Sequence, residues 1–147
     1  MPSNTASVLV ICLGMFAAAV CVVTHCRALR QITNLLGKMK LAAQARMTIL
    51  FLLLLSVHIF EIWIFGFCYY LSEVAMGGDA MTGPRTEGFL EYIYFSAVTY
   101  TTIGYGDLLP LGPVRFVAAV EALSGLLMIG WSASLTYLEM QRFWKIS

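Results

Sequence analysis

Three long apolar runs dominate the chain, at residues 7–26, 47–71 and 114–138. Each is close to the ~20 residues that an α-helix needs to cross the hydrocarbon core of a bilayer. The second run contains His58 and Glu61. About a dozen large apolar residues each favour membrane insertion by roughly −0.3 to −0.6 kcal/mol of free energy. Together they outweigh one central acid, which opposes insertion by about +3 kcal/mol. The pattern therefore predicts three transmembrane helices.

The segment between the second and third runs, residues 72–113, is too polar to be another span. Residues 72–88 are rich in Gly, Glu and Asp and include Pro84, which is typical of a loop in water. Residues 89–100 form an aromatic stretch that is too short to cross a bilayer. Irregular backbone at membrane depth is tolerated only where protein or water surrounds it. We therefore expect a re-entrant half-helix that returns as an irregular segment.

The composition fits a membrane protein and excludes several other classes. Of 147 residues, 60% are hydrophobic and 12% are charged, and the formal net charge is +1, so we expect no nucleic-acid partner. The sequence has no nucleotide-binding glycine loop and no nucleophile with a nearby base, so we expect neither an enzyme nor a small-molecule substrate. Four cysteines without C-x-x-C spacing are interpreted as buried free thiols: Cys12, Cys21, Cys26 and Cys68.

The placement of charges predicts the orientation in the membrane. Five basic residues and no acid follow the first run, at Arg27, Arg30, Lys38, Lys40 and Arg46. The positive-inside rule makes this loop cytoplasmic, which places the N-terminus and the 72–113 loop outside and the C-terminus inside. The other charges agree with this orientation. The tail carries the basic residues Arg142 and Lys145. The outer loop carries more acidic residues, Glu73, Asp79, Glu87, Glu91 and Asp107, than basic ones, Arg85 and Arg115.

Two features of the N-terminal part have alternative interpretations. The first run could be a signal peptide, but no basic residue precedes it, so we expect a retained helix. Within the basic loop, apolar residues recur at helical spacing, at Leu29, Ile32, Leu36 and Met39. They predict either an amphipathic helix on the inner membrane surface or a short tether with chance periodicity.

Residues 101–107, Thr-Thr-Ile-Gly-Tyr-Gly-Asp, are the most specific stretch of the chain. Consecutive backbone carbonyls can replace the water around a cation if they point the same way. Gly104 and Gly106 permit this because glycine reaches positive φ at no steric cost. Ile103 and Tyr105 would then turn outward, and Thr102 can add a hydroxyl oxygen at the inner mouth. An ordinary G-x-G turn is the alternative, but this stretch lies between two membrane-grade apolar runs.

The T-x-G-Y-G-D motif after an aromatic helical stretch resembles the selectivity filter of the potassium channel superfamily. The resemblance covers residues 45–142 and implies an outer helix, a pore helix, a filter and an inner helix. Residues 1–44 would add a transmembrane helix and a basic cytoplasmic linker, and residues 143–147 a short cytoplasmic tail. The implied fold is an all-α membrane protein with three transmembrane helices, a re-entrant pore helix and a filter loop. One chain supplies a quarter of such a filter, so a C4 homotetramer is implied.

The implied function is passive, K⁺-selective conduction across the plasma membrane, with other copies of the chain and the lipid bilayer as partners. No run carries regularly spaced arginines, so we expect no voltage sensor, and the nine residues after Leu138 leave no room for a ligand-binding domain. Two alternatives are a less selective cation channel and a non-conducting regulatory subunit. Intact Tyr105 and Asp107 disfavour the first, and an undegraded filter disfavours the second.

The resemblance also implies roles for individual residues. The ion-binding residues would be Thr102, Ile103, Gly104, Tyr105 and Gly106, with the first four supplying K⁺-coordinating carbonyls, and the filter would be supported by Thr99, Thr101, Tyr94 and Asp107. The central cavity would be lined by Leu126, Ile129, Ala133 and Tyr137. Gly125 matches a hinge glycine and Gly130 lies one turn later, although a glycine in a membrane helix marks either a bend or a close packing contact.

Two positions depart from the family pattern. Tyr94 and Phe95 stand where many members have paired tryptophans, and Val98 stands where some have an acid. Tyr94 can donate a hydrogen bond to Asp107, whereas Phe95 cannot bond the hydroxyl of Tyr105. These changes bear on the rigidity and inactivation of the filter rather than on its selectivity.

Ionisable residues within a membrane are costly and indicate function by default. His58 and Glu61 are three residues apart and share one helix face, and Glu121 lies about two turns into the third run. We expect both acids to lie level with the pore helix. One hypothesis is that the acids are neutral or hydrogen-bonded struts that hold the pore helix, for example through Tyr94, Ser96 or Thr99. The other is a proton-sensitive latch in which His58 becomes charged as pH falls.

Overall fold

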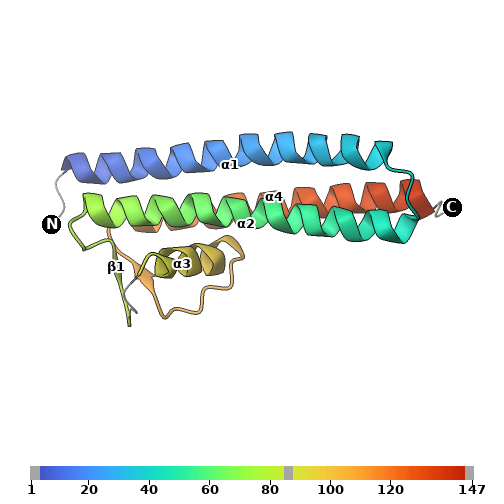
Figure 1. Cartoon of the computed structure of the whole chain (residues 1–147). Helices are drawn as coiled ribbons and strands as arrows, with labels where there is room; N and C mark the ends of the chain where they lie inside the picture. Colours follow the sequence, from blue (N-terminus) through green and yellow to red (C-terminus); the bar gives the residue numbers. More distant parts are fainter. Residues whose placement is uncertain (1–3, 85–87, 145–147) are drawn as a thin grey trace.

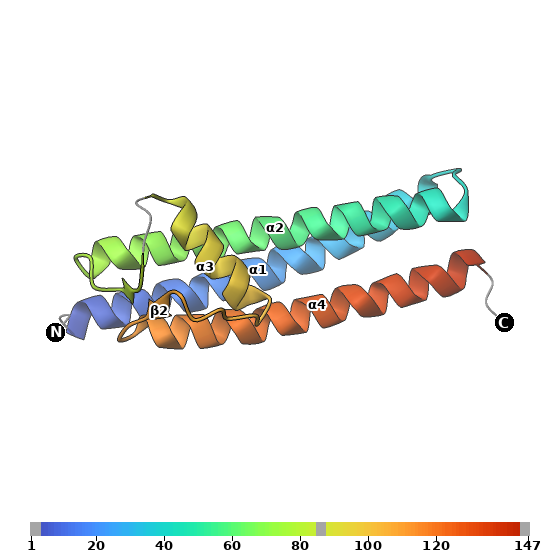
Figure 2. The same ribbon diagram turned by 90° about the horizontal axis from the view of Figure 1, so that it is seen from below.

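The computed structural model describes residues 4–84 and 88–144. The elements in order are α1 (Asn4–Lys38), α2 (Ala43–Ala75), β1 (Met81–Thr82), α3 (Leu90–Tyr100), β2 (Leu109–Pro110) and α4 (Val114–Trp144). Three long helices run side by side, and the short helix α3 lies against one half of their length (Figures 1 and 2). The positions Arg85, Glu87 and Lys145, which entered the charge comparison, and residues 145–147 of the expected tail lie outside the described residues.

The three predicted spans are present as α1, α2 and α4, each long and apolar enough to cross a membrane. In lipid a helix is favoured because it satisfies all of its backbone hydrogen bonds within one segment. Large apolar side chains such as Phe16, Leu52 and Leu127 remain exposed on the single chain, as a lipid-facing or subunit-facing surface requires. The all-α membrane fold predicted from the sequence is therefore confirmed.

The prediction for residues 29–39 was wrong in both of its forms. This segment is neither a separate surface helix nor a tether, because α1 continues to Lys38 and only residues 39–42 connect it to α2. Its apolar positions extend a buried stripe at three- and four-residue spacing, formed by Cys21, His25, Leu29, Ile32 and Leu36. The last three pack against Met47, Leu50 and Leu54 of α2. The periodicity was real, but it marks helix packing rather than a membrane surface.

The expected free thiols are present, although only two of them are buried. Cys21 and Cys68 lie inside the helix bundle, whereas Cys12 and Cys26 are exposed on the single chain. The two exposed thiols lie on the outer faces of α1, where an apolar environment also suits a small, weakly polar side chain.

A short strap that the sequence did not predict joins the two ends of the re-entrant segment. Strands β1 and β2 pair antiparallel, with Met81 opposite Pro110 and Thr82 opposite Leu109. The backbone N–H of Leu111 also donates to the carbonyl of Ala80 over 2.8 Å. The loop before α3 and the segment after the filter are therefore tied together at the end of the bundle where α1 begins (Figure 1).

Helix α1 packs tightly against the start of α4 because Gly14 has no side chain. A Cβ atom at Gly14 would lie 2.7 Å from Cγ2 of Val117, which is fully buried. Small residues allow helices in membranes to approach closely, and dispersion contacts at such points drive their association. Gly14 therefore fixes the distance between α1 and the start of α4.

We predict that Gly14→Leu destabilises the protein, because overpacking a well-filled interface typically costs ~1–3 kcal/mol. Gly37→Leu on the same helix is the matched control, since a Cβ at Gly37 meets nothing within 4 Å. Thermal unfolding of the purified variants in detergent should show a lower midpoint for Gly14→Leu alone. Equal midpoints for the two variants would contradict the close packing of α1 on α4.

Candidate ion-conduction site

The residues of the sequence motif follow directly from the C-terminal end of α3. The N–H of Thr101 donates to the carbonyl of Ala97 over 3.2 Å, and the N–H of Thr102 donates to the carbonyl of Thr99 over 2.9 Å. The N–H of Gly104 reaches back to the carbonyl of Val98 over 3.1 Å. The motif is therefore pinned to the last turn of α3, whose partially negative C-terminal end favours a nearby cation.

The backbone of the motif alternates in handedness. Thr102, Gly104 and Gly106 have positive φ values of 59°, 54° and 79°, whereas Ile103 and Tyr105 do not. Alternating left- and right-handed residues orient successive peptide groups alike, as in the nests in which consecutive N–H groups converge. Positive φ at both glycines was predicted from the sequence and is confirmed. Positive φ at Thr102 was not predicted, and it costs a non-glycine residue ~1–2 kcal/mol.

Asp107 is held by a hydrogen bond from α3. The hydroxyl of Tyr94 donates to Oδ2 of Asp107 over 2.7 Å, and the N–H of Leu108 donates to Oδ1 over 3.1 Å. The bond from Tyr94 lowers the pKa of Asp107, and the same bond raises the pKa of Tyr94 to about 12. Asp107 therefore stays ionised and Tyr94 stays protonated near neutral pH. The pair that the sequence analysis suggested is brought together by the structure.

Glu121 links α4 to α3. Its side chain is fully buried on α4, where Oε1 accepts a hydrogen bond from Ser96 over 2.5 Å. Oε2 accepts a hydrogen bond from the hydroxyl of Tyr69 on α2. The contact to Ser96 is one of the struts considered from the sequence. Tyr69 was missed because it lies in an uninterrupted apolar run, where an aromatic residue gives no signal of its own.

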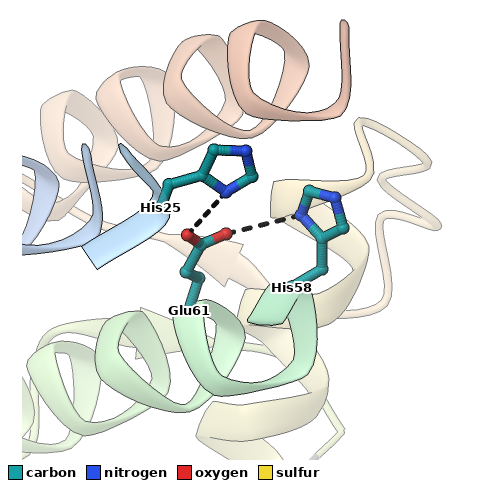
Figure 3. A group of neighbouring side chains, drawn as sticks. All are labelled: His25, His58 and Glu61. Atoms are coloured by element: carbon teal, nitrogen blue, oxygen red, sulfur yellow. Dashed lines mark hydrogen bonds and ion pairs between the residues drawn. The ribbon is translucent and has the colours of Figure 1, made fainter. Parts of the chain in front are cut away.

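Glu61 is also fully buried, but its partners differ from those considered from the sequence. Oε2 accepts a hydrogen bond from Tyr100, the last residue of α3, over 2.6 Å. Oε1 lies 2.9 Å from Nδ1 of His25 on α1, and Oε2 lies 3.4 Å from Nδ1 of His58 (Figure 3). Glu61 thus contacts α3 as the strut hypothesis expected, through Tyr100 rather than through Tyr94, Ser96 or Thr99, which were the examples considered from the sequence.

His25 is the residue that sequence reasoning missed most clearly. It lies at the end of the first apolar run and is fully buried against α2 and α4. One usable signal was available, because His25 and His58 are the two histidines of the chain and each adjoins or lies in an apolar run. A buried histidine needs a polar partner, and Glu61 was the acid nearest the middle of a span.

The glycines of α4 lie within a continuous helix. Gly125 faces the end of α3, and a Cβ atom there would collide with the carbonyl oxygen of Tyr100. Close packing therefore explains Gly125 in this conformation, which was one of the two interpretations of this residue. At Gly130 a Cβ would meet nothing within 4 Å.

The residues expected to line a cavity, Leu126, Ile129, Ala133 and Tyr137, are exposed on the single chain, and so are Leu127 and Trp131. Exposure in one chain therefore does not separate a pore-facing surface of α4 from a lipid-facing one. Two of the residues expected to support a filter lie at the end of α3. The hydroxyl of Thr101 donates to the carbonyl of Ala97 over 2.7 Å, and Thr99 accepts the hydrogen bond from Thr102 described above.

Comparison with known proteins places the sequence of this chain in a family. Residues 57–141, more than half of the chain, match the model of a family described as "Ion channel". Those residues run from the middle of α2 through α3 and the motif to near the end of α4. No solved structure matches the chain.

Several curated proteins are similar to part of the chain. The chain is 39% identical over 66 residues, 44% of its length and 22% of the relative's, to the inward rectifier potassium channel Kirbac3.1 of Paramagnetospirillum magnetotacticum. It is 38% identical over 64 residues, 43% of its length and 16% of the relative's, to two-pore potassium channel 1 of Arabidopsis thaliana. It is 36% identical over 50 residues, 34% of its length and 37% of the relative's, to protein LctB of Geobacillus stearothermophilus.

The aligned parts cover between 16% and 37% of these relatives, so the shared element is a module rather than a whole protein. The family match contains the motif, helix α3, the second half of α2 and most of α4. The resemblance inferred from residues 101–107 and the match to residues 57–141 agree. This chain belongs to the ion channel family that it matches and is a multi-pass membrane protein of the potassium channel superfamily, a channel protein rather than an enzyme.

Proposed function

We propose that this chain forms a K⁺-selective channel that conducts passively across the plasma membrane as a homotetramer. The observation that carries the proposal is the alternation of positive φ at Thr102, Gly104 and Gly106 in a motif pinned to α3. A dehydrated K⁺ ion needs a cage of oxygen ligands, and consecutive carbonyls facing one path supply it. The relatives named as potassium channels support the choice of ion.

In this proposal the carbonyls of Thr102, Ile103, Gly104 and Tyr105 bind K⁺, with Gly106 completing the filter and the hydroxyl of Thr102 at its inner mouth. Thr99, Thr101, Tyr94 and Asp107 support the filter through the hydrogen bonds described above. Potassium is the permeant ion here rather than a resident cofactor. Because the cage is made of neutral backbone dipoles, it holds each ion weakly enough to release it.

Four chains are proposed because one chain cannot surround an ion. Residues 101–107 are all exposed on the single chain, with Ile103 at 56% and Tyr105 at 70%. Burial of this surface against other copies around a four-fold axis closes the assembly without leaving an open end. Leu126, Ile129, Ala133 and Tyr137 then line the cavity below the filter. Gly125 and Gly130 are proposed as the places where α4 bends when the pore opens.

The proposed orientation places the N-terminus and the filter outside the cell and the C-terminus in the cytoplasm. The start of α1 and the β1–β2 strap lie at one end of the bundle, and the turn between α1 and α2 lies at the other (Figure 1). Lys38 and Lys40 lie at that turn, where the positive-inside rule favours the cytoplasm.

Replacement of Gly104 by Ala is predicted to abolish selective K⁺ flux from liposomes that contain the purified protein. A Cβ opposes the φ of 54° at this position and turns its carbonyl away from the ion path. Gly112→Ala is the matched control, because Gly112 has a φ of 50° outside the filter. The control should pass K⁺ and Rb⁺ much better than Na⁺, as the wild type does. Selective flux through Gly104→Ala would refute the assignment of the carbonyl cage.

The assembly is predicted to contain four identical chains. Native mass spectrometry of conducting protein released from detergent should give a mass close to four times the 16.3 kDa chain. Active preparations that contain only monomers and dimers are incompatible with a filter shared by four copies.

The orientation is tested with single cysteines in a background in which Cys12 and Cys26 are Ser. A thiol reagent that cannot cross membranes should label Asn4→Cys on intact cells, because Asn4 is exposed at the start of α1. Lys40→Cys is the matched control, exposed in the turn between α1 and α2, and it should react only after permeabilisation. The reverse pattern would invert the proposed topology.

A further inference from the structure

A compact group of metal-binding side chain types lies behind the filter, away from the ion path. It consists of His25 from α1 and His58 and Glu61 from α2 (Figure 3). Both imidazoles turn Nδ1 toward the carboxylate of Glu61, at 2.9 Å for His25 and 3.4 Å for His58. One ligand atom from each residue lies within 4.8 Å of the others.

The far nitrogens of both rings converge on one hydroxyl. Oγ of Ser132, on α4, lies 3.3 Å from Nε2 of His25 and 3.1 Å from Nε2 of His58. On the near side, the hydroxyl of Tyr100 lies 2.6 Å from Oε2 of Glu61 and 2.8 Å from Nδ1 of His58. The group therefore joins all four helices through side chains that are partly or fully buried.

A count of protons shows that this group has one proton, and therefore one positive charge, fewer than its hydrogen-bond contacts need. With Glu61 ionised and both imidazoles neutral, His25, His58, Ser132 and Tyr100 each have one proton to donate, which makes four. The contacts need five protons. Four of them lie one each in the contacts His25–Glu61, His25–Ser132, His58–Ser132 and Tyr100–Glu61. The fifth is a proton on Nδ1 of His58, donated toward Tyr100 or Glu61. Two buried acceptors without a proton between them are costly.

We propose that a divalent transition-metal ion of the Zn²⁺ type binds here, to Nδ1 of His25, Nδ1 of His58 and the carboxylate of Glu61. The ring protons then sit on both Nε2 atoms and donate to the two lone pairs of Ser132 Oγ. Tyr100 still donates to Glu61, and the proton of Ser132 is available for a backbone carbonyl one turn earlier. No proton is gained or lost, because each neutral imidazole only changes tautomer.

The spacing of the ligand atoms suits such an ion. Zn–N and Zn–O bonds of ~2.0–2.2 Å in a tetrahedral site place ligand atoms about 3.3 Å apart. The His25–Glu61 distance of 2.9 Å runs to Oε1 and the His58–Glu61 distance of 3.4 Å runs to Oε2, and the two values lie on either side of that spacing. One ligand atom from each of the three residues lies within 4.8 Å of the others, so side-chain rotation brings the set around one ion. Two imidazoles with one carboxylate select a borderline metal, and K⁺, Mg²⁺ and Ca²⁺ prefer oxygen alone.

Ser132 and Tyr100 complete the site. Hydrogen bonds to the outer nitrogen of a ligating histidine fix its tautomer and orientation, and Ser132 does this for both rings at once. The hydroxyl of Tyr100 lies 2.6 Å from Oε2 of Glu61 and 2.8 Å from Nδ1 of His58, beside two of the proposed ligands. His58 is the ligand with partial exposure, at 17% of its side chain, whereas His25 and Glu61 have none, so the ion enters from the side of His58. A bound ion would fasten α1 to α2, and through Ser132 and Tyr100 to α4 and the pore helix.

The experiment uses the full-length protein in detergent, stripped with a chelator and dialysed against Zn²⁺ or Co²⁺. We expect one ion per chain by elemental analysis, and a visible Co²⁺ spectrum of tetrahedral nitrogen and oxygen ligation without the intense thiolate band. His25→Gln, His58→Gln and Glu61→Gln should each weaken binding by more than 100-fold, and Ser132→Ala by about 10–100-fold. Cys12→Ser with Cys26→Ser should bind as the wild type does.

Folding is checked separately from binding. Size-exclusion elution and thermal unfolding identify variants that assemble, and Zn²⁺ should raise the unfolding midpoint of the wild type but not of His58→Gln, the substitution at the least buried ligand. An extra proton bound to the group would satisfy the same five contacts without a metal ion. In that case the stripped wild-type protein would take up no stoichiometric metal ion. That result, or full affinity in both histidine variants, overturns the proposal. None of these readings depends on K⁺ flux, so they stand or fall apart from the proposed function.

Discussion

The burial of two carboxylates behind α3 is the constraint on which the rest of this structure depends. Glu61 and Glu121 are completely buried, and a buried carboxylate is tolerated only when hydrogen bonds replace its water. Tyr100 and Ser96 supply those bonds from α3, at 2.6 Å and 2.5 Å. The position of α3, and with it the position of residues 101–107, is therefore set by the two helices that carry the acids. Removing either acid would break a hydrogen bond that ties α3 to these helices.

Much of the fold follows from local signals, because length and hydropathy suffice to identify helices in lipid. The spans, the re-entrant helix and the positive φ of Gly104 and Gly106 were all predictable, since each depends on residues close in the chain. What could not be predicted are pairings between distant residues. His25 meets Glu61 across 36 positions, and no local pattern specifies which buried acid a histidine of another helix will face.

The correction at residues 29–39 and the partner missed for Glu61 have the same physical origin. The apolar stripe of residues 29–39 was compatible with a membrane surface or a neighbouring helix, and periodicity alone does not choose between them. Tyr100 was missed as the partner of Glu61 because Tyr94, Ser96 and Thr99 were weighed without knowing which face of α3 each occupies. In the structure Tyr94 faces Asp107 and Ser96 faces Glu121, which leaves Tyr100 for Glu61. The filter motif escaped this limitation because its chemistry is carried by the backbone.

The strap formed by β1 and β2 has a consequence for the proposed assembly. It joins the chain before α3 to the chain after residues 101–107, with Thr82 opposite Leu109, so α3 and the motif form a closed loop within one subunit. Closing a loop removes conformational entropy whether or not other subunits are present. Part of the ordering of the motif is thus completed in the single chain. If four chains associate as proposed, assembly joins partly organised quarters instead of ordering four flexible segments at once.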